Sequence, residues 1–96
     1  MPRFEWDANK NERNNAKHGI DFETAQLVFD DPFCITFVER LYGGEERWHA
    51  IGAIEDILIL VVVHTYREDR GDEVIRVISA RRATPHERRL YAEAIG

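Results

Sequence analysis

The sequence has little that would cross-link the chain or hold it in a membrane. It contains one cysteine, Cys34, which excludes an internal disulfide, and its apolar neighbours Phe33 and Ile35 favour a buried, reduced thiol. The longest apolar run, residues 57–63, is far shorter than the roughly 20 residues that a membrane span requires. The N-terminus is charged and contains Trp6, unlike the apolar region of a signal peptide. We therefore expect a cytoplasmic protein with no membrane partner.

An excess of positive charge is also missing. The chain carries 13 basic and 18 acidic side chains, a net charge of −5, which argues against a simple nucleic-acid binder. The charge is unevenly distributed, because residues 1–63 hold 6 basic and 12 acidic groups, whereas residues 64–90 hold 7 arginines and 5 acidic groups. We therefore expect any anion-binding surface in the C-terminal third. The acidic remainder would suit a basic protein partner or simply keep the chain soluble.

Motifs for metals and for phosphate-binding loops are absent too. The four histidines, at positions 18, 49, 64 and 86, show no close metal-ligand spacing and no cysteine pair accompanies them. Gly43-Gly44 lacks the further glycines and the strand-to-helix context of a phosphate-binding loop. No metal or other cofactor is expected.

Helix boundaries are well marked at the start of the chain. A chain of this length forms one domain, residues 1–96. Residues 8–18 follow Asp7 as a helix N-cap and stop at Gly19, a residue favoured after a helix end. A second short helix begins after Asp21 and ends at Asp30-Asp31-Pro32, because proline disfavours helical geometry in the residue before it.

A third helix and four strands complete the predicted architecture. Thr84-Pro85-His86-Glu87 combines a capping box with proline at the first helical position, so a helix should begin at Pro85. The alternating and β-branched segments before it predict strands over 33–40, 46–54, 57–66 and 73–82, with turns at 55–56 and 67–72. The order is ααββββα, an α+β fold in which helices pack on an antiparallel four-stranded meander.

Several segments in a fixed order resemble one known family. They are Phe4-Glu5-Trp6-Asp7 with Lys10, Lys17-His18-Gly19, Asp21-Phe22-Glu23-Thr24-Ala25, Val28-Phe29-Asp30-Asp31-Pro32, Glu46-Arg47, Leu60-Val61-Val62-Val63-His64-Thr65 and Ile78-Ser79-Ala80-Arg81-Arg82-Ala83-Thr84. This set resembles the BrnT toxins, small ribonucleases of bacterial type II toxin–antitoxin pairs. The resemblance implies a RelE-like fold, RNA as substrate, and a BrnA-like antitoxin partner with a ribbon-helix-helix region. DNA would be contacted only through that antitoxin.

The predicted strand pairing brings candidate catalytic residues together. If Ile54 pairs with Ile57 across a tight turn, Arg47 lies opposite His64; if His64 also pairs with Arg76, the three side chains share one sheet face. By the same parity, this face also holds His49, Tyr66 and Arg82. A register slip of one residue in the second hairpin would separate them.

Such a cluster fits metal-independent cleavage of RNA by its own 2′-hydroxyl. His64 would act as base or acid, because a histidine titrates near neutral pH, and Arg47 and Arg76 would bind the phosphate. Arg81 and Arg82 could extend the anion site, although strand parity lets only one of them join it. Each residue has a structural alternative, namely a hydrogen-bonded histidine or an arginine in an ion pair.

Three further residues are candidates for RNA binding. Lys17 and His18 lie near a helix C-terminus, where cations are also favoured by the helix dipole. The ring of Tyr66 could stack on a base or could pack at the edge of the core. The competing function for the whole chain is a non-catalytic module whose arginine-bearing sheet face binds an acidic protein segment.

Overall fold

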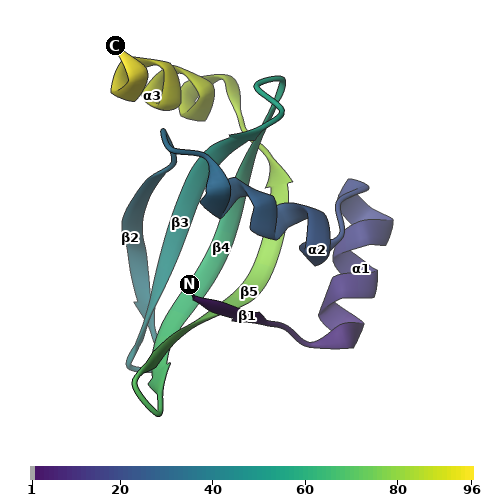
Figure 1. The fold of residues 1–96 in the computed structure, drawn as a ribbon. Helices are drawn as coiled ribbons and strands as arrows, with labels where there is room; N and C mark the ends of the chain where they lie inside the picture. Colours follow the sequence, from purple (N-terminus) through teal and green to yellow (C-terminus); the bar gives the residue numbers. More distant parts are fainter. Residues whose placement is uncertain (1) are drawn as a thin grey trace.

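The computed structural model describes residues 2–96, except for the side chain of Tyr42. In chain order the elements are β1 (Arg3–Glu5), α1 (Ala8–His18), α2 (Phe22–Ala25), the 3-10 helix η1 (Gln26–Asp30), β2 (Ile35–Tyr42), β3 (Glu45–Ile54), β4 (Leu58–Asp69), β5 (Asp72–Arg82) and α3 (Pro85–Ile95). The strands form one sheet in the order β1-β5-β4-β3-β2 (Figure 1). The predicted α+β class is confirmed. None of the helices in residues 2–96 is long and apolar enough to cross a membrane.

Helix α1 has the predicted bounds, and the second helix is shorter than predicted. The side chain of Asp7 accepts a hydrogen bond from the amide of Asn9 at 3.2 Å, and Gly19 takes the left-handed conformation at φ 71°. The next helix starts after its cap Asp21 as predicted, but α2 ends at Ala25 and the chain continues as η1. The single predicted helix is therefore replaced by two short pieces of different winding, of 4 and 5 residues.

Helix α3 begins at Pro85, as its start signal predicted. The amide of Glu87 donates to the Thr84 hydroxyl at 3.2 Å, and the Glu87 carboxylate accepts from the Thr84 amide at 2.8 Å. Two backbone amides that a helix start leaves without partners are satisfied by this exchange. The predicted capping box is confirmed.

The sheet is mixed and has five strands, so the predicted four-stranded antiparallel meander is wrong in its strand count. β1 pairs in parallel with β5, with Glu5 opposite Arg76. Because β1 spans only 3 residues, it is too short to show an alternating pattern in the sequence. The remaining pairs, β2 with β3, β3 with β4 and β4 with β5, are antiparallel.

Both central hairpins differ by one residue from the predicted registers. Ile54 pairs with Leu58 and not with Ile57, so the connection between β3 and β4 holds three residues. At the other end of β4, the strands run on to Asp69 and Asp72, and the predicted turn over 67–72 shrinks to Arg70 and Gly71. Both turn residues have positive φ, 52° and 84°, as two-residue hairpins that follow the sheet twist require.

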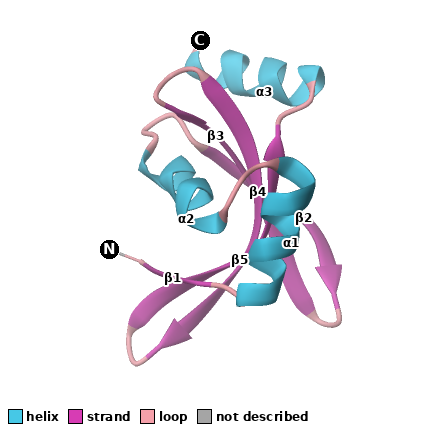
Figure 2. Ribbon diagram, turned by 90° about the vertical axis from the view of Figure 1, so that its right-hand side faces the viewer, coloured by secondary structure: helices cyan, strands magenta, loops and turns pink. Residues whose placement is uncertain are grey.

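The two sides of the sheet carry separate hydrophobic clusters. Helices α1 and α2 and the 3-10 helix η1 cover one face, while α3 packs over one end of the other (Figure 2). The helix-covered face contributes Ala50, Leu60, Val62, Val77 and Ala80 to the larger cluster. The other face contributes Ile51, Ala53 and Val61, which pack with Ala83 and with Tyr91 of α3. The part of the second face that α3 leaves open is therefore the surface available for function.

The hydrogen bonds of one buried side-chain amide connect helix α1 to β5. The side chain of Asn14 donates to the carbonyls of Ile20 and Ala80, both at 2.9 Å, and accepts from the amide of Ala80 at 3.1 Å. Buried polar groups are costly unless they are paired, so this exchange holds the helix at one position along the strand. Asn14 binds β5 at Ala80, beyond the three residues of β5 that pair with β1.

Candidate functional site

Three side chains stand opposite one another on the open face of the sheet. His49 of β3 pairs with Val63 of β4, and Val63 pairs with Ser79 of β5. Their neighbours in the next row, Ala50 and Ala80 among them, belong to the helix-covered core. Because side chains alternate between the faces of a strand, the row of His49 lies on the side without α1 and α2.

Two β-bulges border this row. Val38 pairs with Trp48 and Arg40 with Arg47, which leaves Glu39 as an extra residue in β2. In β5, the register shifts between the partners of Val63 and His64, which leaves Ile78 as an extra residue before Ser79. A bulge redirects a side chain and is common beside active sites. Here the bulges bring both Glu39 and Arg40 from one strand, and both Ile78 and Ser79 from another, to one depression.

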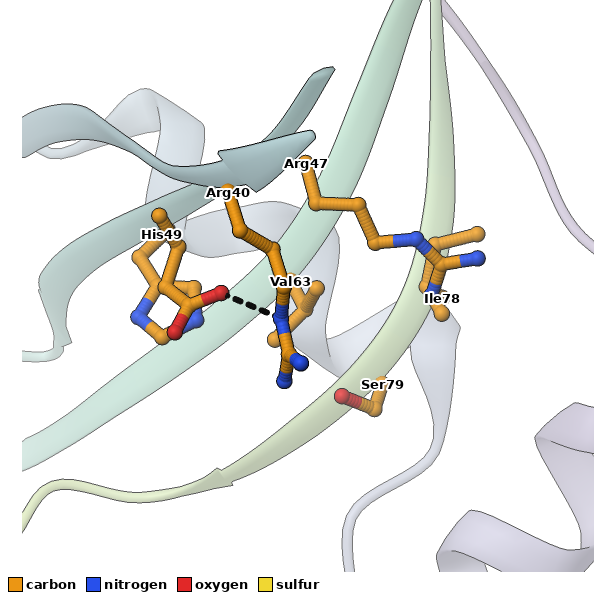
Figure 3. A pocket seen from close by; sticks show the side chains of 7 residues that line it. Arg40, Arg47, His49, Val63, Ile78 and Ser79 are labelled. Carbon is orange, nitrogen blue, oxygen red and sulfur yellow. Dashed lines mark hydrogen bonds and ion pairs between the residues drawn. The ribbon is translucent and has the colours of Figure 1, made fainter. Parts of the chain in front are cut away.

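The depression has a volume of about 300 Å³ and gathers cations at the middle of the open face. Its lining residues are Glu39, Arg40, Arg47, His49, Val63, Ile78 and Ser79. Figure 3 shows the Arg47 side chain extending toward Ile78, while the Arg40 side chain extends past Val63. Arg40 pairs with Glu39 at 2.7 Å, and its side chain is 64% exposed, so a ligand in solution can reach it. We call this depression the arginine–histidine pocket.

His49 has the properties of a proton acceptor in this pocket. It is half-buried, and its ring lies against Phe37 with a centroid separation of 5.5 Å. Burial lowers the pKa of His49 most strongly; the Arg81 charge lowers it further, while Glu39 and Glu87 act in the opposite direction. The imidazole is therefore neutral near pH 7, the form that can take a proton from a hydroxyl group.

Arg81 lies at the border of the pocket and is committed to helix α3. Its guanidinium donates to both carboxylate oxygens of Glu87, at 2.7 and 3.0 Å. These hydrogen bonds are the main cause that lowers the pKa of Glu87 to about 2. Because the same carboxylate closes the capping box of α3, Arg81 ties the helix start to the end of β5. A direct role on substrate, as predicted from the sequence, would have to compete with this pair.

His64 lies on the opposite face from Arg47, so the predicted site geometry is wrong. His64 pairs with Trp48, and its side chain is fully buried on the helix-covered side. Its ring makes edge contacts with Phe29 and Tyr66, both with centroids 4.9 Å away. The physical reason is the connection between β3 and β4, whose additional residue moves every side chain of β4 to the other face relative to β3.

Only one of the two ring nitrogens of His64 has a hydrogen-bond partner among the described residues. Its Nδ1 donates to the Val62 carbonyl at 3.1 Å, because a carbonyl can only accept. No hydrogen-bond partner for Nε2 exists within residues 2–96. Burial is the largest cause that lowers the pKa of His64, and the Val62 hydrogen bond opposes it. His64 therefore serves as a neutral core residue.

Acidification should destabilise the protein through His64. Because its folded pKa lies below its unfolded value, unfolding takes up a proton, and the free energy of unfolding should fall as the pH drops below about 6.5. The slope approaches about 1.4 kcal/mol per pH unit for each such histidine, and His49 acts in the same direction. Urea unfolding between pH 7.5 and 5.5 should show a shallower decline for His64→Gln than for wild type. The exposed His86→Gln is the control, and equal slopes in all three proteins would contradict the assignment.

Five other predicted site residues also lie outside the pocket. Arg76 pairs with Thr65 and does share the open face, but it approaches Glu5 of β1 at 4.0 Å. Tyr66 lies on the helix-covered side, with its ring edge against Trp48 at a centroid separation of 5.3 Å. Arg82 is exposed at the end of β5; it pairs with Leu60 of the helix-covered cluster, so its predicted place on the face of Arg47 is wrong. Lys17 and His18 line a second depression beside α1.

Sequence reasoning missed most of the pocket. Arg47 was predicted, whereas His49 was placed only as a neighbour and Arg40, Glu39 and Ser79 were not singled out. The bulge at Glu39 left no signal, because an extra residue merely makes the alternation of the strand imperfect. Ser79 lies in a segment that carried the family resemblance, which was the only available indication of its importance.

Comparison with known proteins agrees with the sequence resemblance. A family model described as the ribonuclease toxin BrnT of type II toxin–antitoxin systems matches residues 6–87. Among solved structures, the chain is similar to the Brucella abortus ribonuclease toxin BrnT, determined at 1.1 Å resolution. The two are 29% identical with a TM-score of 0.67, over 88% of this chain and 99% of that one. No curated protein sequence matches the chain. With the family model matching most of its length, the chain belongs to the BrnT family of ribonuclease toxins of type II toxin–antitoxin systems.

Proposed function

We propose that this protein cleaves RNA in the arginine–histidine pocket, using the 2′-hydroxyl of the substrate as nucleophile and no metal ion. One observation carries the proposal: two guanidinium groups and one neutral imidazole, from β2 and β3, line the same depression on the open sheet face. RNA cleavage of this kind needs a proton acceptor and positive charge at the phosphate, and these residues are able to supply both. Since RNA is the substrate, we place the activity in the cytoplasm.

The residues of the pocket would divide the chemistry as follows. His49 takes the proton from the 2′-hydroxyl, whose oxygen then attacks the adjacent phosphorus. Arg47 and Arg40 bind the phosphoryl oxygens as negative charge increases on them, because a planar guanidinium can contact two oxygens at once. Glu39 holds Arg40 in place through their ion pair at 2.7 Å. The leaving 5′-oxygen is protonated from the water that enters this exposed site.

This assignment keeps one predicted catalytic residue and replaces two. Arg47 remains, His49 takes the role expected of His64, and Arg40 takes that of Arg76. His64 is fully buried behind the sheet, where a phosphate could not reach it without disrupting the packing of Phe29. Arg76 faces the carboxylate of Glu5 and is not part of the pocket lining.

We also propose that a BrnA-like antitoxin with a ribbon-helix-helix region neutralises this protein and links it to DNA. The support is membership of a toxin–antitoxin family together with the acidity of residues 1–63, which would attract a basic partner. Mixing the two purified proteins and measuring complex formation and loss of RNA cleavage tests this proposal.

Purified wild-type protein should cut RNA in the presence of EDTA and leave 2′,3′-cyclic phosphate ends. Both expectations follow from attack by the 2′-hydroxyl assisted by side chains alone. Gel analysis of the fragments, with enzymatic treatment that opens cyclic phosphates, identifies the ends. Expression of the chain in bacteria should also arrest growth. If folded protein cuts no RNA and leaves growth unchanged, the non-catalytic binding module becomes the better description; strict dependence on a divalent ion would refute the mechanism alone.

A further inference from the structure

A second depression of about 300 Å³ lies between helix α1 and strand β5, and its charged lining is entirely basic. Lys10, Arg13, Lys17 and His18 line it from the helix. Asn14, Ile78 and Ser79 complete the lining, and none of these residues is acidic. In a chain with a net charge of −5, such a concentration of basic side chains is a local departure from the surrounding surface. We call it the α1 cationic surface.

Helical spacing explains why these cations share one side of α1. Lys10, Arg13 and Lys17 follow a spacing of three and four residues, which places side chains along one face of a helix. Asn14 lies in the same stripe, and its hydrogen bonds to Ala80 turn this stripe toward β5. Glu12 lies two residues from Lys10, a spacing that turns it away from them.

The basic side chains of this surface are not neutralised by ion pairs with other described residues of the chain. Within residues 2–96, Lys10, Arg13, Lys17 and His18 take part in no ion pair or side-chain hydrogen bond. Other cations of the chain are paired, such as Arg67 with Glu5 and Arg81 with Glu87. Ion pairing within the chain therefore does not account for the α1 cations. The helix dipole favours cations at Lys17 and His18 in the last turn, but it does not account for Lys10 and Arg13, whereas an external anion would.

The α1 cationic surface adjoins the arginine–histidine pocket. Ile78 and Ser79 line both depressions, so the β5 bulge forms their common wall. A strand that leaves the pocket across Ser79 would come directly onto α1. Lys10 and Lys17 lie seven residues apart, which is about 10 Å along a helix axis. That length accommodates more than one phosphate of a nucleic-acid strand.

We propose that the α1 cationic surface binds the phosphates of single-stranded RNA next to the cleaved bond, so that the substrate is a strand of several nucleotides. The inference rests on the proposed cleavage site and adds the path of the RNA strand beyond that site. Lys10, Arg13, Lys17 and His18 act as positioning residues, because they contact phosphates away from the reacting atoms. The protein should therefore prefer long RNA to a dinucleotide, which would occupy only the arginine–histidine pocket.

The strength of this effect follows from counterion release. For single-stranded nucleic acids, each phosphate neutralised by a cation contributes about 0.7 to the slope of log affinity against log salt. At roughly 0.1 M salt, this corresponds to about fivefold in affinity for each cation. Neutralising Lys10, Arg13 and Lys17 together should weaken binding by about 100-fold and reduce the slope by about 2.

The test compares wild type with Lys10→Gln, Arg13→Gln, Lys17→Gln and the triple variant. Glutamine retains helix propensity while removing the charge. Arg89→Gln is the matched control, because Arg89 is an exposed cation on helix α3 and lines neither depression. For each protein, kcat and KM are measured on a mixed-sequence single-stranded RNA of 20 nucleotides and on a dinucleotide containing the cleaved step. Affinity for the 20-nucleotide RNA is measured by fluorescence anisotropy at several salt concentrations, and thermal unfolding shows that each variant is folded.

The expected result is a rise in KM for the long RNA with little change in kcat, a smaller salt slope, and a reduced preference for long RNA over the dinucleotide. Arg89→Gln should match wild type. Unchanged KM and salt slope in the folded triple variant would overturn the inference while cleavage by wild type still supports the proposed function. Retained RNA affinity with lost affinity for a polyglutamate peptide would instead assign the surface to an acidic protein segment. If wild type cleaves neither RNA but the variants bind the 20-nucleotide RNA more weakly than wild type does, the proposed function fails and the binding surface stands.

Discussion

Replacing Arg47 by alanine is expected to reduce kcat/KM for RNA cleavage by about 100-fold or more, the range seen when one preorganised charge-stabilising group is removed. Arg47 extends into the arginine–histidine pocket beside Arg40, and its guanidinium has the geometry to bind two phosphoryl oxygens (Figure 3). Charge on those oxygens is greater in the transition state than in the bound substrate. The loss should therefore appear in kcat as well as in KM.

Arg76→Ala provides a matched control for this experiment. Both arginines lie on the same face of the sheet and are partly buried, but Arg76 lies beside Glu5 and outside the pocket. The loss of kcat/KM in Arg76→Ala should be smaller than the loss in Arg47→Ala by at least one order of magnitude. Arg47→Lys should recover only part of the activity, because an ammonium group retains the charge and loses the bidentate geometry. Comparable losses for Arg76→Ala and Arg47→Ala, with both proteins folded, would show that Arg76 takes part in cleavage, as the sequence predicted, and would contradict a site confined to the pocket.

The second large effect is expected for His49→Gln, with a loss of about 10²- to 10⁴-fold in kcat/KM, the usual contribution of a positioned acid–base group. His49 lies in the row opposite Val63 and Ser79, between the two arginines and the start of α3. Glutamine can hydrogen-bond but cannot accept a proton near neutral pH. The variant should retain RNA binding, since the arginines still hold the phosphate.

The pH profile separates a chemical role of His49 from a structural one. Because burial lowers the pKa of His49, its neutral form predominates down to a pH below about 6.5, and kcat/KM should decline only below that point. This decline should disappear from the residual activity of His49→Gln and remain in His86→Gln. Activity of His64→Gln, corrected for the fraction of folded protein, should stay close to wild type. A decline that follows His64 and not His49 would return the catalytic role to the buried residue.

Local features of the chain were predictable because they depend on neighbours in the sequence. The start of α1 after Asp7 and the capping box at Thr84 are short-range hydrogen-bond patterns, and both occur as expected. The approximate positions of β2 to β5 followed from alternation and β-branched content. Arg47 was predicted as a site residue for the same reason, and it does lie in β3, where it lines the pocket.

Strand registers decided the site, and these depend on the exact lengths of the connections. Ile54 pairs with Leu58 where Ile57 was predicted, and Arg76 pairs with Thr65 where His64 was predicted, so each pairing shifts by a single position. The two shifts cancel between β3 and β5, so Arg47 and Arg76 do share a face. On that face, Thr65 of β4 takes the place where His64 was expected, and its side chain is buried. Because side chains alternate with a period of two, an error of one residue is enough to bury the wrong histidine.

The sequence by itself determined the family, the start of each α-helix, the approximate positions of β2 to β5 and the place of Arg47 in β3. Only the tertiary structure decided which histidine faces the open side, that Arg40 lines the same depression as Arg47, and that Ser79 lines both this depression and the one beside α1. The physical reason is that capping and strand propensity are local, whereas a bulge or a hairpin length is selected by packing on both faces of the sheet at once. Glu39 and Ile78, the two bulge residues, show no local pattern that distinguishes them from their neighbours, yet their placement shapes the pocket.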